Sequence, residues 1–531
     1  MPSLNWIGKE AVTNHDKAIP FRLLKKIKAA SVGIDSENLI IHGDNLEALK
    51  ALMPYYHGKI KCIYIDPPYN TGNEGWIYND KVNSPKIKKW LKQTVKSDDL
   101  TRHDKWLCMI YPRLKLLRDL LSEDGVLFIS IDDNELNSLH GVMNEIFGEN
   151  RFIGNLVWYK KRKGSFLSKT LVSLTEYILV YKKSSKSIPL LGSKPDRTGS
   201  QPLVKRTNSR KILSFEAGII KTRLKDGKYK KGLYGIGSSA INLIESVTIK
   251  NGLILDKVKL EGPFIWTQTT LDEALLEGAQ ITINTNNFQP RVIKIFKEEE
   301  HKGLPSFIDG REFSATNDDA YEDIKEIFQE EKIFNYSKPK NLLSYLINAA
   351  TFQDKNAIIL DSFAGSGTTG HAVLDLNKVD GGTRKFIMVE MEDHVAKDIT
   401  AERIKRVIKK YNYKDGFEYC ELGKPLFDET GHIEKTCDFN QFATYIYFTE
   451  TQRNIDQKEI EGNFIGQDTN IEFYLIYKAL KTNNLDKAFI KKLRKTENKK
   501  IIYADRCLLD DETLTQHNIV FKQIPYEVKI Y

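Results

Sequence analysis

The segment IYIDPPYN, residues 63–70, places an acid, two prolines and a tyrosine directly after an apolar run. A proline fixes its own φ angle, lacks an N–H group and forces the preceding residue into extended geometry. The segment therefore leaves its strand as a stiff loop whose carbonyl groups are not used in helix hydrogen bonds. These carbonyl groups and the Asp66 carboxylate can accept hydrogen bonds from another molecule. A simple Asp-Pro-Pro turn with a buried tyrosine is the structural alternative.

A second motif is rich in glycine. In AIILDSFAGSGTTGHAV, residues 357–373, Gly365, Gly367 and Gly370 have G-x-G-x-x-G spacing after a strand and at a helix start. Glycine lets the backbone come close to a ligand, and Glu390 lies where an acid that binds ribose hydroxyls is expected. The pattern indicates a nucleotide-like cofactor, although a structural glycine turn also produces it. The Gly-Lys-Ser/Thr ending of a P-loop is missing, which disfavours ATP hydrolysis.

Asp361 helps to decide between two candidate cofactors, NAD and S-adenosylmethionine. It lies at the tip of the strand, ahead of the glycines, where a carboxylate would repel a pyrophosphate but could bind an ammonium group. S-adenosylmethionine carries such an amine, a ribose for Glu390 and an adenine that Phe363 could flank. We therefore expect S-adenosylmethionine. An NAD-dependent oxidoreductase remains the alternative, and it leaves the Asp-Pro-Pro-Tyr segment unexplained.

Both motifs follow strands in a chain that alternates between buried strands and helices. We expect strands in NLIIHGD and IKCIYID, the helix NLEALKALMPYY between them, and a further helix and strand in RLKLLRDLLSEDGVLFISIDD. Continuous apolar strands separated by helices are typical of a parallel sheet covered on both faces. The carboxyl ends of such strands form the ligand crevice. Asp44 and Asp66, which each end a strand, are therefore expected to face one site.

The chain of 531 residues is too long for a single core, and its pattern changes along the sequence. Residues 183–333 are polar, basic and irregular, and we expect a separate insert there. Between Asp196 and Lys231, eleven Lys or Arg residues stand against three acids. Such a field suits a polyanion, although a solvated surface is an equal alternative. The alternation of strands and helices resumes at residue 334 and ends near residue 410.

Composition limits the cellular context. The net charge is +9, and the five cysteines are widely spaced and form no C-x-x-C pair. We therefore expect reduced thiols and neither a disulfide framework nor a metal site. The N-terminal stretch has no apolar signal region, and no apolar run approaches the length of a membrane span. These features predict a soluble, cytoplasmic protein without a membrane partner.

Together, DPPYNTG and DSFAGSGTTG resemble the beta class of amino-methyltransferases that act on DNA bases, in which the catalytic motif precedes the cofactor motif. The longer DPPYNTGNEGWIYND, the stretch GREFSATNDD and the insert are similar to the modification (Mod) subunits of Type III restriction-modification systems. The resemblance covers roughly residues 38–410. It implies an α/β, Rossmann-like S-adenosylmethionine-dependent methyltransferase fold with a mixed, mostly parallel sheet and a permuted motif order.

The resemblance also implies a domain organisation. Residues 1–182 would form the catalytic half of the methyltransferase domain and residues 334–410 its cofactor-binding half. Residues 183–333 would be a target-recognition insert, and residues 411–531 a C-terminal domain that contacts a second copy or another partner.

Site roles follow from the same resemblance. The motif formed by Asp66, Pro67, Pro68 and Tyr69 would be catalytic: the carboxylate and the Pro67 carbonyl would bind the two hydrogens of a target amino group, and Tyr69 would stack on the flipped base. Trp158 and Tyr159 either wall the base pocket or belong to the core. The cofactor would be bound by Asp361, Phe363, Gly365, Gly367, Thr368, Glu390, Asp44 and Lys338.

These features favour methylation of adenine N6 in double-stranded DNA. Cytosine-N4 methylation is the same chemistry on another base, and Asp rather than Ser at position 66 favours adenine. A subunit that mainly recruits a nuclease is an alternative of another class. The resemblance implies a homodimer and a separate restriction (nuclease and helicase) subunit, because the chain shows no nuclease motif of its own.

Overall fold

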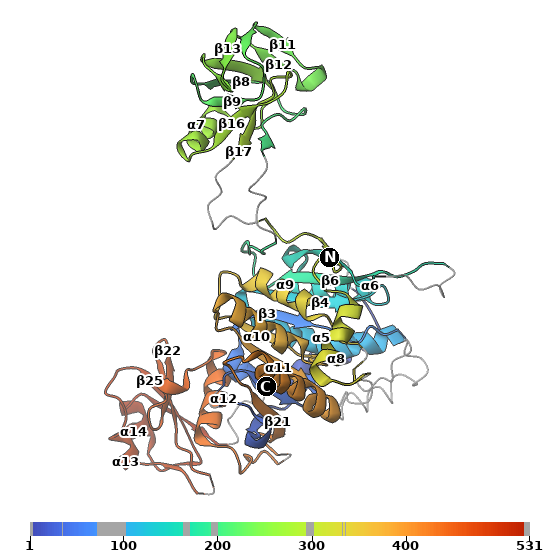
Figure 1. Ribbon diagram of the computed structural model, residues 1–531. Coiled ribbons are helices and arrows are strands. Elements are labelled where there is room, and N and C mark those ends of the chain that lie inside the picture. The colour runs from blue at the N-terminus through green and yellow to red at the C-terminus, as the bar shows by residue number, and fades with distance from the viewer. Residues whose placement is uncertain are drawn as a thin grey trace. The chain divides into compact units, whose positions relative to one another are not determined.

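The computed structural model describes residues 4–33, 36–71, 102–162, 170–192, 200–293, 302–331, 333–334, 336–428, 430–479 and 481–524. The chain forms two compact units (Figure 1). Unit 1 combines Met1–Leu190 with Pro305–Tyr531, and unit 2 is Leu191–Leu304.

A ten-stranded sheet forms the centre of unit 1. Six neighbouring strands in its middle run parallel, and antiparallel pairings occur towards its edges. The expected mixed, mostly parallel sheet is therefore confirmed. In spatial order the strands are β1 (Arg22–Lys26), β21 (Glu418–Pro425), β2 (Leu39–His42), β20 (Lys385–Glu390), β19 (Ile358–Asp361), β3 (Ile60–Ile65), β4 (Leu121–Ile131), β6 (Thr175–Lys182), β5 (Phe152–Tyr159) and β18 (Phe307–Asp309).

The order of strands interleaves distant parts of the sequence. Strands β19 and β20, from the second half of the chain, lie between β2 and β3 from the first half. Ile359 of β19 pairs with Cys62 of β3, and His42 of β2 pairs with Glu390 of β20. The carboxyl ends of these four strands consequently meet at one edge of the sheet.

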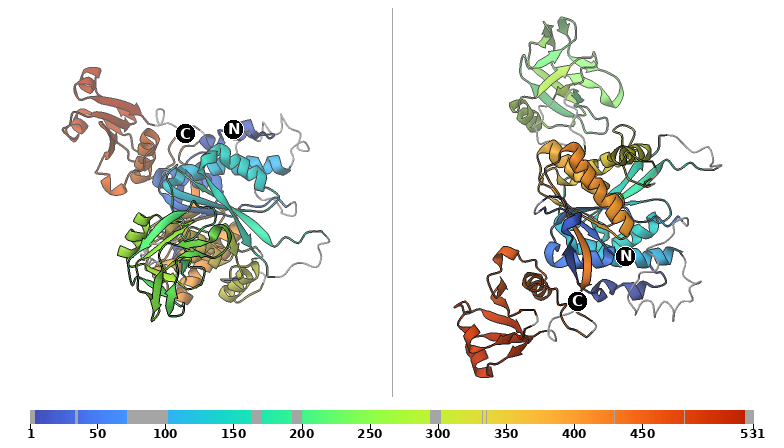
Figure 2. Two further views of the ribbon diagram at one scale, coloured as in Figure 1. Left: turned by 90° about the horizontal axis from the view of Figure 1, so that it is seen from above. Right: turned by 60° about the horizontal axis from the view of Figure 1, so that its bottom comes forward.

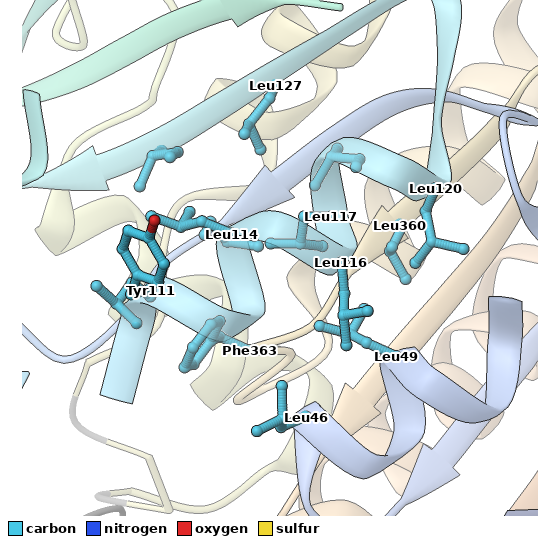
Figure 3. Close-up of a cluster of buried hydrophobic side chains, with 14 of the residues drawn as sticks. Leu46, Leu49, Tyr111, Leu114, Leu116, Leu117, Leu120, Leu127, Leu360 and Phe363 are labelled. Atoms are coloured by element: carbon cyan, nitrogen blue, oxygen red, sulfur yellow. The ribbon is translucent and has the colours of Figure 1, made fainter. Parts of the chain in front are cut away.

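Helices cover both faces of this sheet (Figures 1 and 2). The apolar side chains of α3 and α5 pack on the sheet in one continuous core, where Leu360 of β19 lies close to Leu49 and Leu116 (Figure 3). The principal helices of unit 1 are α3 (Asn45–Tyr56), α5 (Arg102–Leu120), α6 (Leu136–Phe147), α8 (Asn317–Phe328), α9 (Lys340–Thr351), α10 (Thr368–Asp380), α11 (Glu402–Tyr411) and α12 (Phe439–Thr451).

The helix expected after β20 begins as a wider turn. Residues Val395–Ala401 form a π-helix that continues into α11. Thr400 in this turn donates from Oγ1 to the Gly365 carbonyl at 2.6 Å, and the Thr400 carbonyl would lie 3.1 Å from a Cβ at Gly367. The π-turn therefore brings the chain against the glycine loop.

Unit 2 consists of two antiparallel-rich sheets around its own core, which contains the fully buried Phe215, Phe264 and Phe288. One sheet has four strands: β11 (Gly232–Tyr234), β12 (Ile241–Leu243), β15 (Val258–Gly262) and β8 (Lys211–Phe215). The other has seven: β10 (Gly227–Tyr229), β13 (Val247–Lys250), β14 (Leu253–Ile254), β9 (Ile220–Thr222), β16 (Gln280–Ile283), β17 (Arg291–Ile293) and β7 (Gln201–Pro202). Helix α7 (Gln268–Leu276) completes the unit.

The compact unit 2 is shorter than the insert expected from the sequence, 183–333. Strand β18 pairs with β5 at the edge of the large sheet, and Arg406 of α11 donates to the Phe328 carbonyl at the end of α8 at 2.8 Å. Residues 305–333 therefore belong to unit 1, because β18 and α8 pack on its elements. Their polar sequence does not reveal these partners.

Residues after β21 extend unit 1 with a smaller sheet formed by β22 (Phe464–Asp468), β23 (Ile471–Leu475), β25 (Lys499–Ala504) and β27 (Ile519–Gln523). Its core includes α12 together with Phe21 and Ala51 from the N-terminal part of the chain. The five cysteines are free thiols. Across the described ranges, no helix is long and apolar enough to cross a membrane.

The core between β19, α3 and α5 permits a stability prediction. Leu360→Ala removes a fully buried side chain and should lower the free energy of unfolding of unit 1 by about 2–5 kcal/mol. Val379→Ala removes an exposed apolar side chain and should change it by less than about 0.5 kcal/mol. Urea unfolding followed by tryptophan fluorescence measures both. Equal effects of the two substitutions would contradict this packing.

Candidate active site

Four acids follow four adjacent parallel strands at one edge of the large sheet. Asp44 comes after β2, Glu390 ends β20, Asp361 ends β19 and Asp66 comes after β3. Asp44 and Asp66 thus lie on the same edge, as expected, but the two other strands separate them. Four carboxylates gathered at one sheet edge create a site that favours positive or hydrogen-bond-donating ligands.

The Asp-Pro-Pro-Tyr loop meets a lysine from the second half of the chain. Lys338 Nζ lies 2.9 Å from both carboxylate oxygens of Asp66 and donates to the Tyr69 hydroxyl at 2.9 Å. Its ammonium group also lies 5.0 Å from the centre of the Tyr69 ring. The Lys338 carbonyl accepts a hydrogen bond from Thr368 Oγ1 at 3.2 Å. Lys338 therefore connects the catalytic motif with the glycine loop, whereas the sequence suggested only a cofactor role.

Glu176 is a site residue that the sequence did not reveal. It lies at the second position of β6, is 7% exposed, and has Oε2 3.4 Å from Lys338 Nζ. Its other oxygen, Oε1, pairs with Lys160 Nζ at 2.6 Å. The Tyr69 hydroxyl lies 3.1 Å from Glu176 and 2.9 Å from Asp66, so its single hydrogen can bond to either carboxylate. The only signal in the sequence was an acid inside the apolar strand TEYILVYKK.

The four charges of this cluster balance one another. Burial raises the pKa of Asp66, helped by the charge of Glu176, while Lys338 opposes the rise. Burial also acts to raise the pKa of Glu176, but Lys338 and Lys160 outweigh it and hold that pKa below its ordinary value. Burial acts to lower the pKa of Lys338, and the two carboxylates outweigh it. Two carboxylates thus share two ammonium groups in a largely water-free setting.

The backbone of the loop is fixed by a tryptophan and an asparagine. Trp106 is fully buried and donates from Nε1 to the Pro68 carbonyl at 2.7 Å. Asn70 adopts a left-handed conformation with φ 60° and donates to the buried Glu135. The continuation of the motif beyond Thr71 lies outside the described residues.

Trp158 and Tyr159 have different surroundings. Trp158 is fully buried, donates to the Ala315 carbonyl at 2.8 Å and has its ring centre 5.9 Å from Lys338 Nζ. The Tyr159 ring lies under the Arg311 guanidinium at 4.1 Å. Trp158 therefore lies near the ammonium group of Lys338, whereas Tyr159 contacts Arg311.

The three glycines of the second motif serve different purposes. Gly365 and Gly367 adopt left-handed conformations, with φ 50° and 77°, that other residues rarely adopt, and Gly367 precedes the first turn of α10. Gly370 lies inside α10, where an added Cβ would come within 2.7 Å of Met388. Glu390 accepts from the Gly365 N–H at 2.8 Å, so the acid and the loop hold each other in place.

Arg403 is a second residue whose role the sequence analysis did not predict. It binds the side chains of the glycine loop. It is fully buried, and its Nη1 donates to Thr368 Oγ1 at 2.7 Å and to Ser366 Oγ at 3.0 Å. Burial lowers the pKa of its guanidinium to about 10. In the sequence it looks like any basic residue of an amphipathic helix, and only the turn that brings α11 to the loop reveals its role.

Asp361 and Asp44 already have partners within the chain. Asp361 is 3% exposed and accepts from the Phe363 N–H at 3.0 Å and from Thr369 Oγ1 at 2.5 Å. Burial, with the nearby charges of Asp66 and Glu390, raises its pKa to about 7. Asp44 caps α3 through the Leu46 N–H at 2.9 Å and lies 3.4 Å from Arg113. Their roles towards a cofactor stay predictions.

Comparison with known proteins gives the family. A model described as DNA methylase matches residues 60–402. The chain is 32% identical to the Type III restriction-modification enzyme EcoP15I Mod subunit of Escherichia coli, over 85% of this chain and 75% of that protein. It is 31% identical to the Type II methyltransferase M.KpnI of Klebsiella pneumoniae, over 72% of this chain and 85% of that protein. In the solved structure of TTHA0409 from Thermus thermophilus, 72% of this chain aligns with 99% of that chain at 14% identity and a TM-score of 0.32.

The chain belongs to the N6/N4 DNA methylase family and is related over most of its length to Type III modification subunits. It is accordingly a DNA methyltransferase, and the methyl donor of this family is S-adenosylmethionine.

The residues around the glycine loop fit this cofactor. The strand ends carry carboxylates, which suit a positively charged ligand. Glu390 accepts three backbone N–H groups, from Gly365, Met391 and Glu392, which leaves one of its lone pairs for a ribose hydroxyl. Ser362 Oγ is buried beside the loop and has no hydrogen-bond partner within the described part of the chain. Buried polar atoms are normally paired, so this hydroxyl is available to a ligand.

The raised pKa of Asp361 yields a prediction for the cofactor-free protein. Because its pKa is about 7 in the folded chain and 3.8 is its ordinary value, its stabilising contribution is complete below about pH 4 and is lost as the pH rises through 7. Asp361→Asn keeps the shape and can still accept from the Phe363 N–H, while its amide NH2 donates to Thr369 Oγ1 instead of accepting from it, and it cannot ionise. The variant should gain stability over the wild type between pH 4 and pH 8, by on the order of a few kcal/mol.

Thermal midpoints of the two proteins, measured at several pH values without S-adenosylmethionine, test this. A difference in midpoint that stays constant across the range would show that Asp361 does not titrate there. From the predicted role of Asp361, adding the cofactor to the wild type should reduce the loss at high pH, because the ammonium group would stabilise the charged carboxylate.

Proposed function

We propose that the chain methylates the N6 amino group of an adenine that has been flipped out of double-stranded DNA. The observation that carries this proposal is the cluster of Asp66, Tyr69 and Lys338 beside the glycine loop. Bound S-adenosylmethionine supplies an electrophilic methyl group on a sulfonium. The side chains of the cluster provide the acceptors and the aromatic face that the nucleophile needs.

The exocyclic amine is a poor nucleophile because its lone pair is delocalised into the ring. The Asp66 carboxylate and the Pro67 carbonyl accept its two hydrogens and favour the tetrahedral nitrogen whose lone pair attacks the methyl carbon. As the N–C bond forms and the S–C bond breaks, the amine loses one proton to Asp66. The raised pKa of Asp66 suits it to this task. Tyr69 stacks on the base and keeps it outside the duplex.

Lys338 occupies the position that the target amine must take on Asp66. Its ammonium group donates to the carboxylate at 2.9 Å and lies 5.0 Å from the centre of the Tyr69 ring, so a base that stacks on Tyr69 and bonds to Asp66 has to displace it. Glu176 lies 3.4 Å from the same nitrogen and keeps the displaced ammonium group paired. Glu176 is thus a positioning residue that acts through Lys338. The exchange avoids leaving an unpaired buried charge, which would be strongly destabilising.

Adenine is favoured over cytosine by the acid at position 66, although the geometry of an exocyclic amine is the same in both bases. The similarity to the EcoP15I Mod subunit supports a Type III modification subunit that works with a separate restriction subunit. The homodimer is a prediction from the sequence resemblance. Unit 2 is the candidate target-recognition domain. The similarity to M.KpnI keeps a solitary methyltransferase as the second candidate.

Removing the carboxylate should abolish the reaction. Asp66→Ala is expected to lower methyl transfer by at least about 100-fold, because one acceptor and the proton acceptor are lost together. Asp66→Asn retains one carbonyl acceptor and should lose nearly as much. Glu176 still pairs with Lys338 in both variants, so cofactor binding and folding should be kept.

The measurement is a nucleoside mass analysis of unmethylated DNA after incubation with protein and S-adenosylmethionine. N6-methyladenine made only by the wild type is the expected result. N4-methylcytosine would keep the mechanism and change the base. Absence of any methylated base, with the cofactor shown to bind, would contradict the proposal and favour the recruitment of a nuclease as the main role.

Glu176→Gln tests whether Glu176 holds the ammonium group of Lys338 after the base has displaced it from Asp66. Without this negative charge the ammonium group stays on Asp66, so kcat should fall roughly tenfold. The pKa of Asp66 should fall as well, because the charge of Glu176 helps to raise it, and the acidic limb of the pH–kcat profile should move to lower pH. Glu245→Gln, at an exposed ion pair with Lys259, is the matched control. A lower kcat with an unmoved pH profile would mean that Glu176 is only structural.

A further inference from the structure

Unit 2 exposes one isoleucine almost completely. Ile236 is 92% exposed in the connection between β11 and β12, which form an antiparallel hairpin. It lies between Gly235 and Gly237, whose φ angles of 90° and 68° are left-handed. Ile236 itself has an ordinary extended conformation, with φ −130° and ψ 146°, that any polar residue could adopt. The backbone therefore does not explain why an apolar residue is present here.

The connection is firmly held at its base. The Tyr234 ring packs on the fully buried Phe288 at 4.5 Å. Beyond the tip, Gln289 Nε2 donates to the Ser239 carbonyl at 3.1 Å and Arg210 Nη1 donates to the Ala240 carbonyl at 3.0 Å. These contacts hold both ends of the connection and leave the Ile236 side chain pointing away from the core. A partner that covers it would gain the free energy of burying a large apolar side chain.

The charge of unit 2 is unevenly distributed along its sequence. Residues 200–239 contain ten Lys or Arg and two acids, whereas residues 240–293 contain four Lys or Arg and six acids. Lys228, Lys230 and Lys231 are exposed, and no ion pair involves them in the described part of unit 2. An unpaired basic group of this kind attracts phosphates.

The basic segment and the tip share one support. Tyr229 follows Lys228 and packs on Phe288 at 5.5 Å, as Tyr234 does at 4.5 Å. The Tyr234 hydroxyl also donates to the Lys230 carbonyl at 2.6 Å. Within unit 2, β11 and β12 lie at the end opposite to β17 (Figure 1). The hairpin that carries Ile236 and the basic segment before it are thus held by the same buried phenylalanine.

We propose that Ile236 is a wedge that inserts between the stacked bases of DNA while the neighbouring lysines bind the phosphates. Apolar side chains on rigid tips unstack base steps in this way, and the surrounding basic residues fix their position on the duplex. The inference rests on DNA as the substrate of the proposed function and adds a specific contact to it. The hairpin also exposes Leu233, which is 67% exposed, but the unpaired lysines that precede β11 favour a polyanion over a protein partner.

The test uses the full chain and closed circular plasmid DNA of mixed sequence. Topoisomerase I relaxes the plasmid in the presence of the protein, and the change in linking number for each bound protein reports on insertion. Equilibrium binding to the same DNA, measured at several salt concentrations, reports on phosphate contacts. Methyl transfer by the wild type is followed in parallel, so that a failure of the proposed function is distinguished from a failure of the wedge.

Ile236→Ala should lower the affinity about tenfold and remove part of the unwinding, while the dependence of log affinity on log salt stays unchanged. Ile236→Leu keeps an apolar wedge and should restore both. Lys230→Gln with Lys231→Gln should reduce the salt slope by about two and leave the unwinding for each bound protein intact. Leu276→Ala is the matched control, since Leu276 is 89% exposed in the same unit but follows Asp272 and Glu273 and precedes Glu277.

Unwinding and affinity of Ile236→Ala equal to those of the wild type would overturn the proposal, and so would a wild type that does not unwind the plasmid at all. Equal losses in Ile236→Ala and Leu276→Ala would also overturn it, because exposure alone would then explain the effect. A loss of methyl transfer with normal DNA binding and unwinding in Ile236→Ala would assign the residue to a contact with protein instead.

Discussion

The site depends on keeping a carboxylate charged in a place that excludes water. In the proposed mechanism Asp66 accepts the hydrogens of an amine, yet its burial raises its pKa and favours the protonated form. Lys338 favours the charged form of Asp66, since its ammonium group lies 2.9 Å from both oxygens and opposes the rise in pKa. That cation needs its own second partner, which Glu176 supplies, and Glu176 in turn is neutralised by Lys160. Each charge in the cluster is tolerated because the next one is present.

This arrangement explains why the strands of the two halves interleave. Asp66 follows β3 and Asp361 ends β19, and these two strands are direct neighbours although nearly 300 residues separate them. Lys338 precedes α9 and reaches across to Asp66, while its carbonyl binds the glycine loop through Thr368. In the proposed reaction a methyl group passes between the two motifs, which requires them to be adjacent in the sheet. Their order along the chain is then irrelevant, which is why the permuted order is compatible with the chemistry.

The sequence predicts those parts of the site that follow a local rule. Prolines, glycines and acids at the ends of apolar strands are recognisable from their neighbours alone, so the sequence marks Asp66, Gly365, Gly367 and Glu390 as candidates, and the structure places all four at one edge of the sheet. The sequence does not mark Glu176 and Arg403, because each acquires its role from a residue distant in sequence, Lys338 and Thr368 respectively. The boundary of unit 2 was misplaced for the same reason. The strand β18 has three residues, and its membership of the large sheet is decided by pairing with β5.

The two units differ in their charge. The cluster around Asp66 in unit 1 is balanced, whereas the described part of unit 2 carries unpaired lysines. In the catalytic cluster two carboxylates meet two ammonium groups, so the site exerts little net attraction on a polyanion. Acids crowd the strand ends around it, which favours a cationic cofactor but opposes phosphates. Attraction of DNA must therefore come from elsewhere in the chain, and the unpaired lysines of unit 2 supply a field of the required sign. In the proposed function unit 2 carries target recognition, and the residues of the Asp66–Lys338 cluster and of the glycine loop all lie in unit 1.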